Sequence, residues 1–267
     1  MIRQTSFCCA MLCAALSVGA QQLTPDKVLV SPENRLSVKD KDLRNAVRDW
    51  SKAQLASTDY AKISAHPSAA VFPGSVGESA VRVTETVSIS HRQISDALAP
   101  VVATLHFSQP WRNTMYSTGL YAVAGEYIEV TVPESLLDKN VCIQIGAHSD
   151  NLTRWVAGGE DWRRMPDIVR IDTLRKKITR ITSPFGGLIY VTAGPKSASW
   201  TAPVKISRAV KAPLFIAGKT TAEDWARQLA GSKAPWGSWL PKRSSSLSPI
   251  PSSGRWAIRI MCSNCGT

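Results

Sequence analysis

The residues best suited to chemistry stand directly after an apolar run, in the segment IGAHSDN. His148, Asp150 and Asn151 place an imidazole, a carboxylate and an amide close together there, with Ser149 between them. Such groups ligate metal ions or hydrogen-bond to sugar hydroxyls. The alternative is a strand-to-loop turn in which Asp150 and Asn151 cap backbone groups. This alternative is favoured, because no second histidine lies at ligand spacing.

Aromatic and basic residues gather just beyond, in the segment NLTRWVAGGEDWRRMP. Tryptophan faces beside arginines and acidic residues suit a carbohydrate or an acidic polymer, and a loop of this length is often functional. The alternative is that the tryptophans pack over an edge of the fold with their N–H groups bonded. The predicted ligand-binding residues of the two segments are His148, Asp150, Asn151, Trp155, Trp162, Arg163 and Arg164.

Motifs for hydrolytic catalysis are absent from the sequence. There is no His-Glu-x-x-His for a zinc peptidase helix and no Gly-x-Ser-x-Gly for a serine nucleophile. His66, His91 and His106 are dispersed, and Cys262 and Cys265 form a lone Cys-x-x-Cys without a second pair. We therefore predict no catalytic residue, no metal ligand and no cofactor in this chain.

The N-terminus has the pattern of a secretory signal. Arg3 supplies the positive region, residues 7–16 the apolar region, and residues 17–20 a small-residue cleavage site before Gln21. The apolar run is too short to span a bilayer, so we expect no transmembrane segment. The sequence predicts a protein that is secreted, periplasmic or at the cell surface after cleavage near Ala20.

The overall charge is compatible with several kinds of acidic partner. The chain of 267 residues carries a formal net charge of +12, and its mean hydropathy of -0.08 with 44% hydrophobic residues is typical of a globular protein. The basic residues are spread along the chain, and no helix-turn-helix stands out. Together with export, this argues against a nucleic-acid partner.

Elements with the periodicity of strands occupy most of the chain. Apolar residues alternate, or run without a break, between glycine, proline, Asn or Asp punctuation in residues 80–90, 101–107, 127–132, 141–146, 168–172, 176–182, 187–193 and 203–210. Many short strands with little helix between them predict a mainly β fold, specifically an antiparallel β-sandwich with short flanking helices.

Two helices are predicted to flank the strands. The first begins at Asp42, with Asp40 or Asp42 as its cap and a buried face of Leu43, Ala46, Val47, Trp50 and Ala53. The second follows a capping box formed by Thr220 and Glu223 and ends at Gly231 as a glycine cap. Its predicted buried face is Ala222, Trp225, Ala226 and Leu229.

Several blocks in a fixed order resemble one protein family. They span about residues 70–236 and are STGLYAVAGE (117–126) followed by YIEVTVPE, IGAHSDN (145–151), WRRMP (162–166), PFGGLIYV (184–191) and VKAPLFIAGKTTAEDW (210–225). The chain resembles the region that precedes the catalytic domain in enhancin-like, mucin-degrading zinc metallopeptidases, metallopeptidase family sixty. The resemblance implies an accessory domain covalently linked to a peptidase domain that uses zinc and acts on glycoproteins such as mucins.

The resemblance stops at residues 235–237, after which the family continues with Glu-Leu and this chain does not. If Ser238 is encoded by AGY, one G inserted after the Gly237 codon restores Gly-Glu-Leu, and the serine run beyond becomes apolar. We therefore hypothesise that one nucleotide was lost here and that about residues 238–267 are translated out of frame. The alternative is a basic, Ser/Pro-rich disordered tail. The nucleotide sequence distinguishes the two.

The predicted organisation is a signal peptide at 1–20, a leader with one amphipathic helix at 21–66, a β-sandwich accessory domain at 67–222, a capped helix with a Pro-Trp block at 223–237, and an out-of-frame or disordered tail at 238–267. Two functions follow from this organisation. The domain binds or positions glycoprotein or mucin glycans, or it is a structural partner that only supports a peptidase domain. In either case we expect no peptidase activity from this chain.

Overall fold

The computed structural model describes residues 24–93, 113–148, 160–194, 196–240 and 261–262 of the chain. Within these ranges the helices are α1 (Lys41–Ala56) and α4 (Ala222–Gly231), with 3-10 turns at Pro67–Ala70 and Glu134–Leu136. The strands are β1 (Val83–His91), β2 (Thr114–Ala122), β3 (Tyr127–Thr131), β4 (Cys142–Ile145), β5 (Arg170–Thr173), β6 (Ile178–Thr182), β7 (Gly187–Ala193), β8 (Trp200–Lys211), β9 (Leu214–Ile216), β10 (Trp236–Leu240) and β11 (Met261–Cys262).

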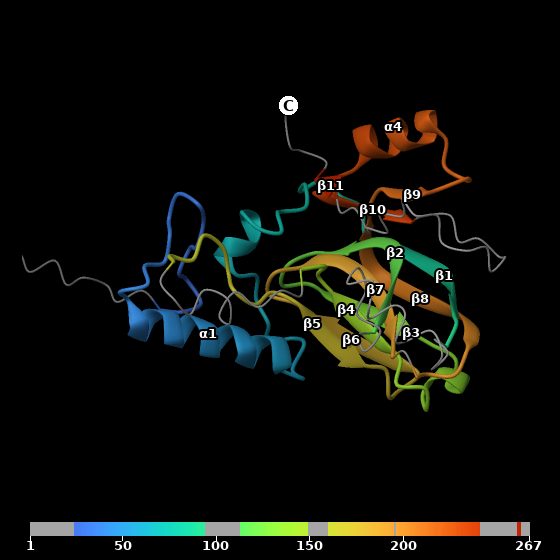
Figure 1. Cartoon of the computed structure of the whole chain (residues 1–267), viewed down its shortest axis with the longest axis horizontal. Helices are drawn as coiled ribbons and strands as arrows, with labels where there is room; N and C mark the ends of the chain where they lie inside the picture. Colours follow the sequence, from blue (N-terminus) through green and yellow to red (C-terminus); the bar gives the residue numbers. More distant parts are fainter. Residues whose placement is uncertain (1–23, 94–112, 149–159, 195, 241–260, 263–267) are drawn as a thin grey trace, which may run out of the picture.

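Strands β1 to β8 form one antiparallel sheet, which we call the curved sheet. Its order is β5-β4-β7-β2-β8-β3-β6, with β1 paired to β8. Figure 1 shows this sheet curling until it is nearly barrel-shaped, with β5 and β6 near one another at its two ends. The prediction of a mainly β, antiparallel fold is confirmed. Within the described residues, strands β1 to β8 are joined by hydrogen bonds into one sheet through β8, so the finer prediction of a sandwich is not specifically shown.

A bulge in β8 lets this strand serve both halves of the curved sheet. Its first part pairs with β1 and β3, and its last residues, Val210 and Lys211, pair with β2. The register with β1 shifts between the two parts, and Arg208 there has a φ of +65°, in the left-handed region. A bulge bends a strand and increases its twist, which is what the change of partner requires.

Aliphatic side chains fill the interior of the curved sheet. Ile143, Ile189 and Val204, from β4, β7 and β8, belong to a cluster of buried residues that strands β1 to β4 and β6 to β8 supply. In β8 buried and exposed residues alternate from Trp200 to Ile206, as expected for a strand with one face on a core. This cluster is the main source of hydrophobic stabilisation in the molecule.

Most of the predicted strands are present, and β7 has the bounds predicted for it. The strand predicted at residues 101–107 lies outside the described residues. Strand β2 was not predicted, because Ser117, Thr118 and Gly119 interrupt its apolar alternation. Gly119 has a φ of +69°, and the register with β7 shifts at this point, so the strand continues through an irregularity that sequence periodicity does not reveal.

The N-terminal segment builds a second core against one end of the curved sheet. Helix α1 buries Val47 and Ser51, and its partly buried Trp50 packs in a cluster with Phe185 and Trp162. The predicted helix is confirmed, with Asp40 at the N-cap position, although the Asp40 side chain makes no capping hydrogen bond. Ala46 and Ala53, predicted to be buried, are exposed.

Strands β9 and β10 pair in parallel and, with α4, form what we call the C-terminal unit (residues 214–240). Figure 1 shows this unit above the curved sheet. The boundary predicted between residues 237 and 238 falls inside β10, where Ser238 pairs with Leu214. The reading-frame hypothesis stays a prediction.

The ends of α4 correct the sequence interpretation. The capping residue is Thr221, whose hydroxyl accepts a hydrogen bond from the Asp224 N–H at 3.0 Å, while the Thr220 hydroxyl accepts one from the Ile216 N–H at 2.9 Å. Gly231 is the last helical residue, and the C-cap is Ser232. The predicted buried face is wrong for Ala222 and Ala226, which are exposed; Trp225 and Leu229 are half-buried, and no residue of α4 is fully buried.

Candidate binding surface

Four of the predicted ligand-binding residues lie in the described part of the chain: His148, Trp162, Arg163 and Arg164. The other three, Asp150, Asn151 and Trp155, lie outside the described residues. Arg163 and Arg164 line a surface cavity of about 360 Å³ whose walls are completed by Pro32, Val71, Phe72, Glu160, Asp161 and Trp162. We call this hollow the Phe72 cavity.

Trp162 forms the floor of the Phe72 cavity. Its side chain is only 4% exposed, and its backbone pairs with Leu36 in an isolated bridge. The Arg44 guanidinium lies over the indole, 4.4 Å from the ring centroid. Because its ring is packed in the second core, Trp162 is not available for stacking on an external sugar. It matches the alternative interpretation in being packed at the edge of the fold, but its buried indole N–H has no hydrogen-bond partner among the described residues.

The accessible wall of the cavity combines charged and apolar groups. The Arg164 guanidinium lies 5.0 Å from the Phe72 ring centroid and donates to the Met165 carbonyl at 3.3 Å. Glu160 and Arg163 are exposed, and Val71 is 42% exposed. Guanidinium groups donate hydrogen bonds and carboxylates accept them, so this wall offers both kinds of partner to a polyhydroxylated ligand beside apolar contacts.

Asp161 ties the cavity wall to the N-terminal segment. Its Oδ1 accepts a hydrogen bond from the Val38 N–H at 2.9 Å, and its charge acts on the neighbouring Arg44. Because the carboxylate is engaged with the protein's own backbone, its role here is to position the segment that carries Trp162. The exposed charged side chains of the cavity that remain to face a ligand are Arg163 and Glu160.

The wall carrying Val71 and Phe72 is positioned by a buried histidine. His66 is 2% exposed, between Trp50 at 4.7 Å and Phe185 at 5.5 Å between ring centroids. Its Nδ1 accepts a hydrogen bond from the Ser68 N–H at 3.2 Å, which caps the 3-10 turn leading to Val71. Burial lowers the pKa of His66, and this favours the neutral ring that can accept the bond.

His148 belongs to an aromatic cluster behind the cavity. Its ring stacks on Phe72 with 4.8 Å between centroids and meets the edge of Trp236 at 5.4 Å. The Trp236 indole N–H donates to the Pro73 carbonyl, and the Tyr121 hydroxyl donates to the Gly74 carbonyl at 3.1 Å. These contacts hold the loop after Phe72 against the end of the curved sheet, so His148 supports the Phe72 cavity from behind.

Phe72 and Trp236 were not predicted as site residues. They lie far apart in the sequence, and only the fold brings them to His148. The sequence signal that was available is the Phe-Pro-Gly loop at residues 72–74, which marks a turn without indicating its partners.

Metal-binding and membrane-spanning features are not found in the described ranges. Among those residues no group of three His, Cys, Asp or Glu side chains is placed to hold a metal ion. No helix there is long and apolar enough to cross a membrane.

Two family descriptions match adjoining parts of the chain. Residues 85–207 match the N-terminal domain of M60-like peptidases, and residues 208–249 match Peptidase M60, enhancin and enhancin-like. The matches meet within β8, beside the bulged residue Arg208.

Similar curated proteins are much longer than the part they share with this chain. TRPM8 channel-associated factor 1 from Bos taurus is 36% identical over 140 residues, which cover 52% of this chain and 15% of that protein. TRPM8 channel-associated factor 3 from Rattus norvegicus is 36% identical over 125 residues, covering 47% of this chain and 13% of that protein. The chain therefore spans about 15% of the length of the curated relatives it matches.

Similar solved structures include bacterial metallopeptidases. The IMPa metallopeptidase from Pseudomonas aeruginosa is 14% identical, with a TM-score of 0.47 over 66% of this chain and 18% of that chain. IMPa in complex with an O-glycopeptide is 17% identical, with a TM-score of 0.41 over 62% and 17% of the two chains. The ZmpB metallopeptidase from Clostridium perfringens is 19% identical, with a TM-score of 0.41 over 60% and 33%.

Proposed function

This chain belongs to the M60-like peptidases through the N-terminal domain at residues 85–207, and from that premise we propose that it positions glycoproteins such as mucins for a zinc peptidase domain. The family match is the observation that carries the proposal. Residues 208–249 match the peptidase family itself, so accessory and peptidase sequence follow one another in one chain. The partner we propose for this domain is therefore a covalently linked peptidase domain.

The contact surface in this proposal is the Phe72 cavity. Its exposed Arg163 and Glu160 supply a hydrogen-bond donor and an acceptor, and Val71 supplies an apolar contact. Sugars present hydroxyls that need both kinds of polar partner, and they present C–H faces that pack on apolar groups. Asp150, Asn151 and Trp155 remain part of the proposed contact surface from their place in the sequence.

The residues that the structure describes form no zinc site. The sequence contains no His-Glu-x-x-His, and the described residues bring no three potential ligands together. A catalytic zinc needs such a set to hold the ion and to activate its water. We therefore derive no zinc-dependent step from this chain and propose that it does not cleave glycoproteins. Chelator-sensitive cleavage of mucin by the purified chain would contradict this.

A charge placed in the Phe72 cavity tests the contact surface. We expect the full chain to bind immobilised gastric mucin and Val71→Asp to weaken that binding at least about tenfold, because a carboxylate would replace an apolar contact. Val81→Asp is the matched control: Val81 is 75% exposed and does not line the cavity, so its binding should stay unchanged. Biolayer interferometry measures both.

Folding must be intact for this comparison to count. Near-ultraviolet circular dichroism and thermal midpoints of the two variants should match those of the unmodified chain, since both valines are exposed. Mucin binding that is equal in Val71→Asp and Val81→Asp would remove the Phe72 cavity from the proposal. A chain that binds no mucin at all would overturn the positioning function itself.

A purely structural role is the second candidate, and the C-terminal unit favours it. Trp239 is 38% exposed beside Phe215, and α4 has no fully buried residue. Large apolar side chains left uncovered in this way are typical of an interface. If this surface awaits a peptidase domain, the full chain should self-associate on size exclusion and Trp239→Glu should reduce that association. A monomer that binds no mucin would contradict both candidates.

Export is part of the proposal and has its own test. We propose that the protein is secreted or reaches the periplasm or cell surface after cleavage near Ala20. Mass spectrometry of protein recovered outside the cytoplasm should find an N-terminus at Gln21. An uncleaved chain retained in the cytoplasm would contradict it.

A further inference from the structure

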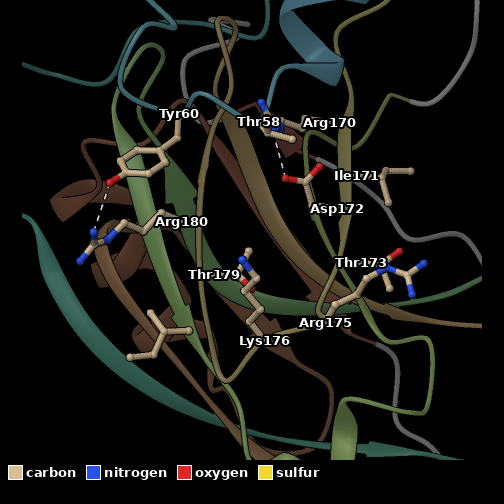
Figure 2. Close-up of a pocket in the computed structure, with 11 residues that line it drawn as sticks. Thr58, Tyr60, Arg170, Ile171, Asp172, Thr173, Arg175, Lys176, Thr179 and Arg180 are labelled. Atoms are coloured by element: carbon tan, nitrogen blue, oxygen red, sulfur yellow. Dashed lines mark hydrogen bonds and ion pairs between the residues drawn. The ribbon is translucent and has the colours of Figure 1, made fainter.

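The two ends of the curved sheet leave a cavity between them. Strand β5 pairs with β4 and β6 pairs with β3, and within the described residues no hydrogen-bonded register joins β5 to β6. A cavity of about 680 Å³ opens there, between the two strands, the turn that connects them and the segment after α1. Figure 2 shows this cavity, which we call the β5–β6 cleft. Its volume lies within the usual range for small-ligand sites.

Positive charge dominates the lining of the cleft. The lining includes Arg170, Arg175, Lys176 and Arg180, and among the described residues the only carboxylate that lines it is Asp172. Charges of one sign collected in a concave surface raise the local concentration of the opposite charge. The cleft therefore favours an anionic group.

Two of these cations are fixed in place. Arg170 is 2% exposed and donates from Nη1 to the Thr182 carbonyl at 2.9 Å and from Nη2 to Asp172 at 2.9 Å. Its buried Nε has no hydrogen-bond partner within the part of the chain that the structure describes. Arg180 donates from Nε to Glu129 at 2.9 Å and from Nη1 to the Tyr60 hydroxyl at 3.1 Å, as the dashed line in Figure 2 marks.

The other two cations are exposed and have no acidic partner in the described ranges. Arg175 and Lys176 stand on the turn between β5 and β6, and no ion pair or side-chain hydrogen bond engages either of them there. The turn itself is anchored, because Leu174 is 0% exposed and its N–H donates to the Val141 carbonyl at 2.8 Å. Two charged groups on a fixed turn are thus available to a ligand.

Apolar groups lie beside the charges. Ile171 and Ile178 are 51% and 52% exposed on the two sides of the cleft. The Tyr60 ring is held near β6, because the Thr182 hydroxyl donates to the Tyr60 carbonyl at 2.7 Å. A ligand that fits must therefore combine an anionic group with a compact body that has apolar faces.

We propose that the β5–β6 cleft binds an acidic saccharide, with its carboxylate or sulfate on Arg175 and Lys176 and its ring against Ile171, Ile178 and Tyr60. Arginine forms paired hydrogen bonds with carboxylate and sulfate oxygens, and lysine adds a point charge. The choice of a saccharide, among compounds that carry such an anion, rests on the proposed glycoprotein function. The site is separate from the Phe72 cavity, since the two share no lining residue.

Small saccharides test the cleft without mucin. We expect the full chain to bind 3′-sialyllactose or lactose 3′-sulfate at least about tenfold more tightly than lactose in isothermal titration calorimetry, because lactose lacks the anion. A preference for one of the two acidic sugars identifies the carboxylate or the sulfate. Raising the salt from about 50 mM to about 500 mM should weaken binding of the acidic sugar.

A matched pair of double variants locates the binding. Arg175→Ala with Lys176→Ala should weaken binding of the preferred acidic sugar at least about tenfold, through loss of two charged contacts. Lys219→Ala with Lys233→Ala removes the same charge from exposed positions flanking α4 and should leave binding unchanged.

The outcomes separate this proposal from the proposed function. Equal binding of lactose and the acidic sugars, or equal loss in the two double variants, would overturn the cleft as a saccharide site. Displacement of the sugar by a hexaglutamate peptide at equal concentration would assign the cleft to acidic peptides and overturn it as well. If the cleft variants bind mucin normally, the cleft fails while the positioning function stands. If the chain binds the acidic sugars but no mucin, the positioning function fails while the cleft stands as a saccharide site.

Discussion

The curved sheet and the C-terminal unit adjoin one another in the chain, yet they bury their residues to different extents. Every residue of β7 is buried, with one face on the main core and the other beneath the C-terminal segments, whereas α4 buries none completely. The two family matches meet between residues 207 and 208, which lies within β8 and before the C-terminal unit begins at Leu214. The comparison indicates that the curved sheet has its own core, whereas α4 of the C-terminal unit is only partly covered by the described residues.

Paired leucine truncations give the largest expected contrast. Leu136 is 1% exposed in the main core, and we expect Leu136→Ala to cost about 2–5 kcal/mol of unfolding free energy through lost burial and a cavity. Leu229→Ala in half-buried α4 should cost less than about 1 kcal/mol. Urea denaturation of the full chain measures both. Equal costs would show that the C-terminal unit is as well packed as the sheet.

Removing the N-cap of α4 tests the same difference in packing between the C-terminal unit and the curved sheet, with a smaller expected change in stability. Thr221→Ala removes the hydroxyl that accepts from the Asp224 N–H and should destabilise the helix by about 1 kcal/mol. Because few contacts tie α4 to a core, we expect faster hydrogen exchange in α4 and unchanged exchange in β7. Parallel acceleration in β7 would mean that the two regions unfold together.

A surface ion pair on the curved sheet gives the smallest effect. Arg82 donates from Nε and Nη2 to the two carboxylate oxygens of Glu126, at 2.9 and 2.6 Å, with both side chains about one-third exposed. Arg82→Ala should cost about 0.2–1 kcal/mol at neutral pH. A larger cost would mean that stability of the sheet depends on its rim as well as on its core.

The contribution of this pair depends on pH in a defined direction. The hydrogen bond and charge of Arg82 lower the pKa of Glu126 below its ordinary value. The stabilisation is therefore present above the unfolded pKa of about 4.3 and is lost as the pH falls through the lower, folded pKa. The difference in urea midpoint between the unmodified chain and Arg82→Ala should shrink in acid. A difference that grows in acid would contradict the assigned pairing.

The parts of the fold that sequence could predict are those where local patterns match the final environment. Strand β7 is a continuous apolar run, and it was predicted with its observed bounds. Strand β2 was missed because Gly119 allows an irregularity that breaks the pattern, and the cap of α4 was placed one residue early because Thr220 and Thr221 are both capping types. Local sequence patterns do not determine which of two adjacent threonines is the N-cap of the helix.

The candidate sites show the same limit. Arg163 and Arg164 were predicted as neighbours in sequence and share one cavity, but Phe72 joins them only through the fold. The cations of the β5–β6 cleft could not be predicted as a site from the sequence. Arg170 and Arg180 reach one cavity only through strand register and the packing of the segment after α1. Convergence of this kind follows from topology, which composition and spacing do not fix.

The most direct test of the central claim compares one mucin with and without its O-glycans. If the chain positions glycoproteins by their sugars, the full chain should bind intact gastric mucin and lose at least about tenfold in affinity after enzymatic removal of the O-glycans from the same preparation. Biolayer interferometry on matched surfaces gives both values. Equal affinity for the two preparations, or binding to neither, would contradict the account.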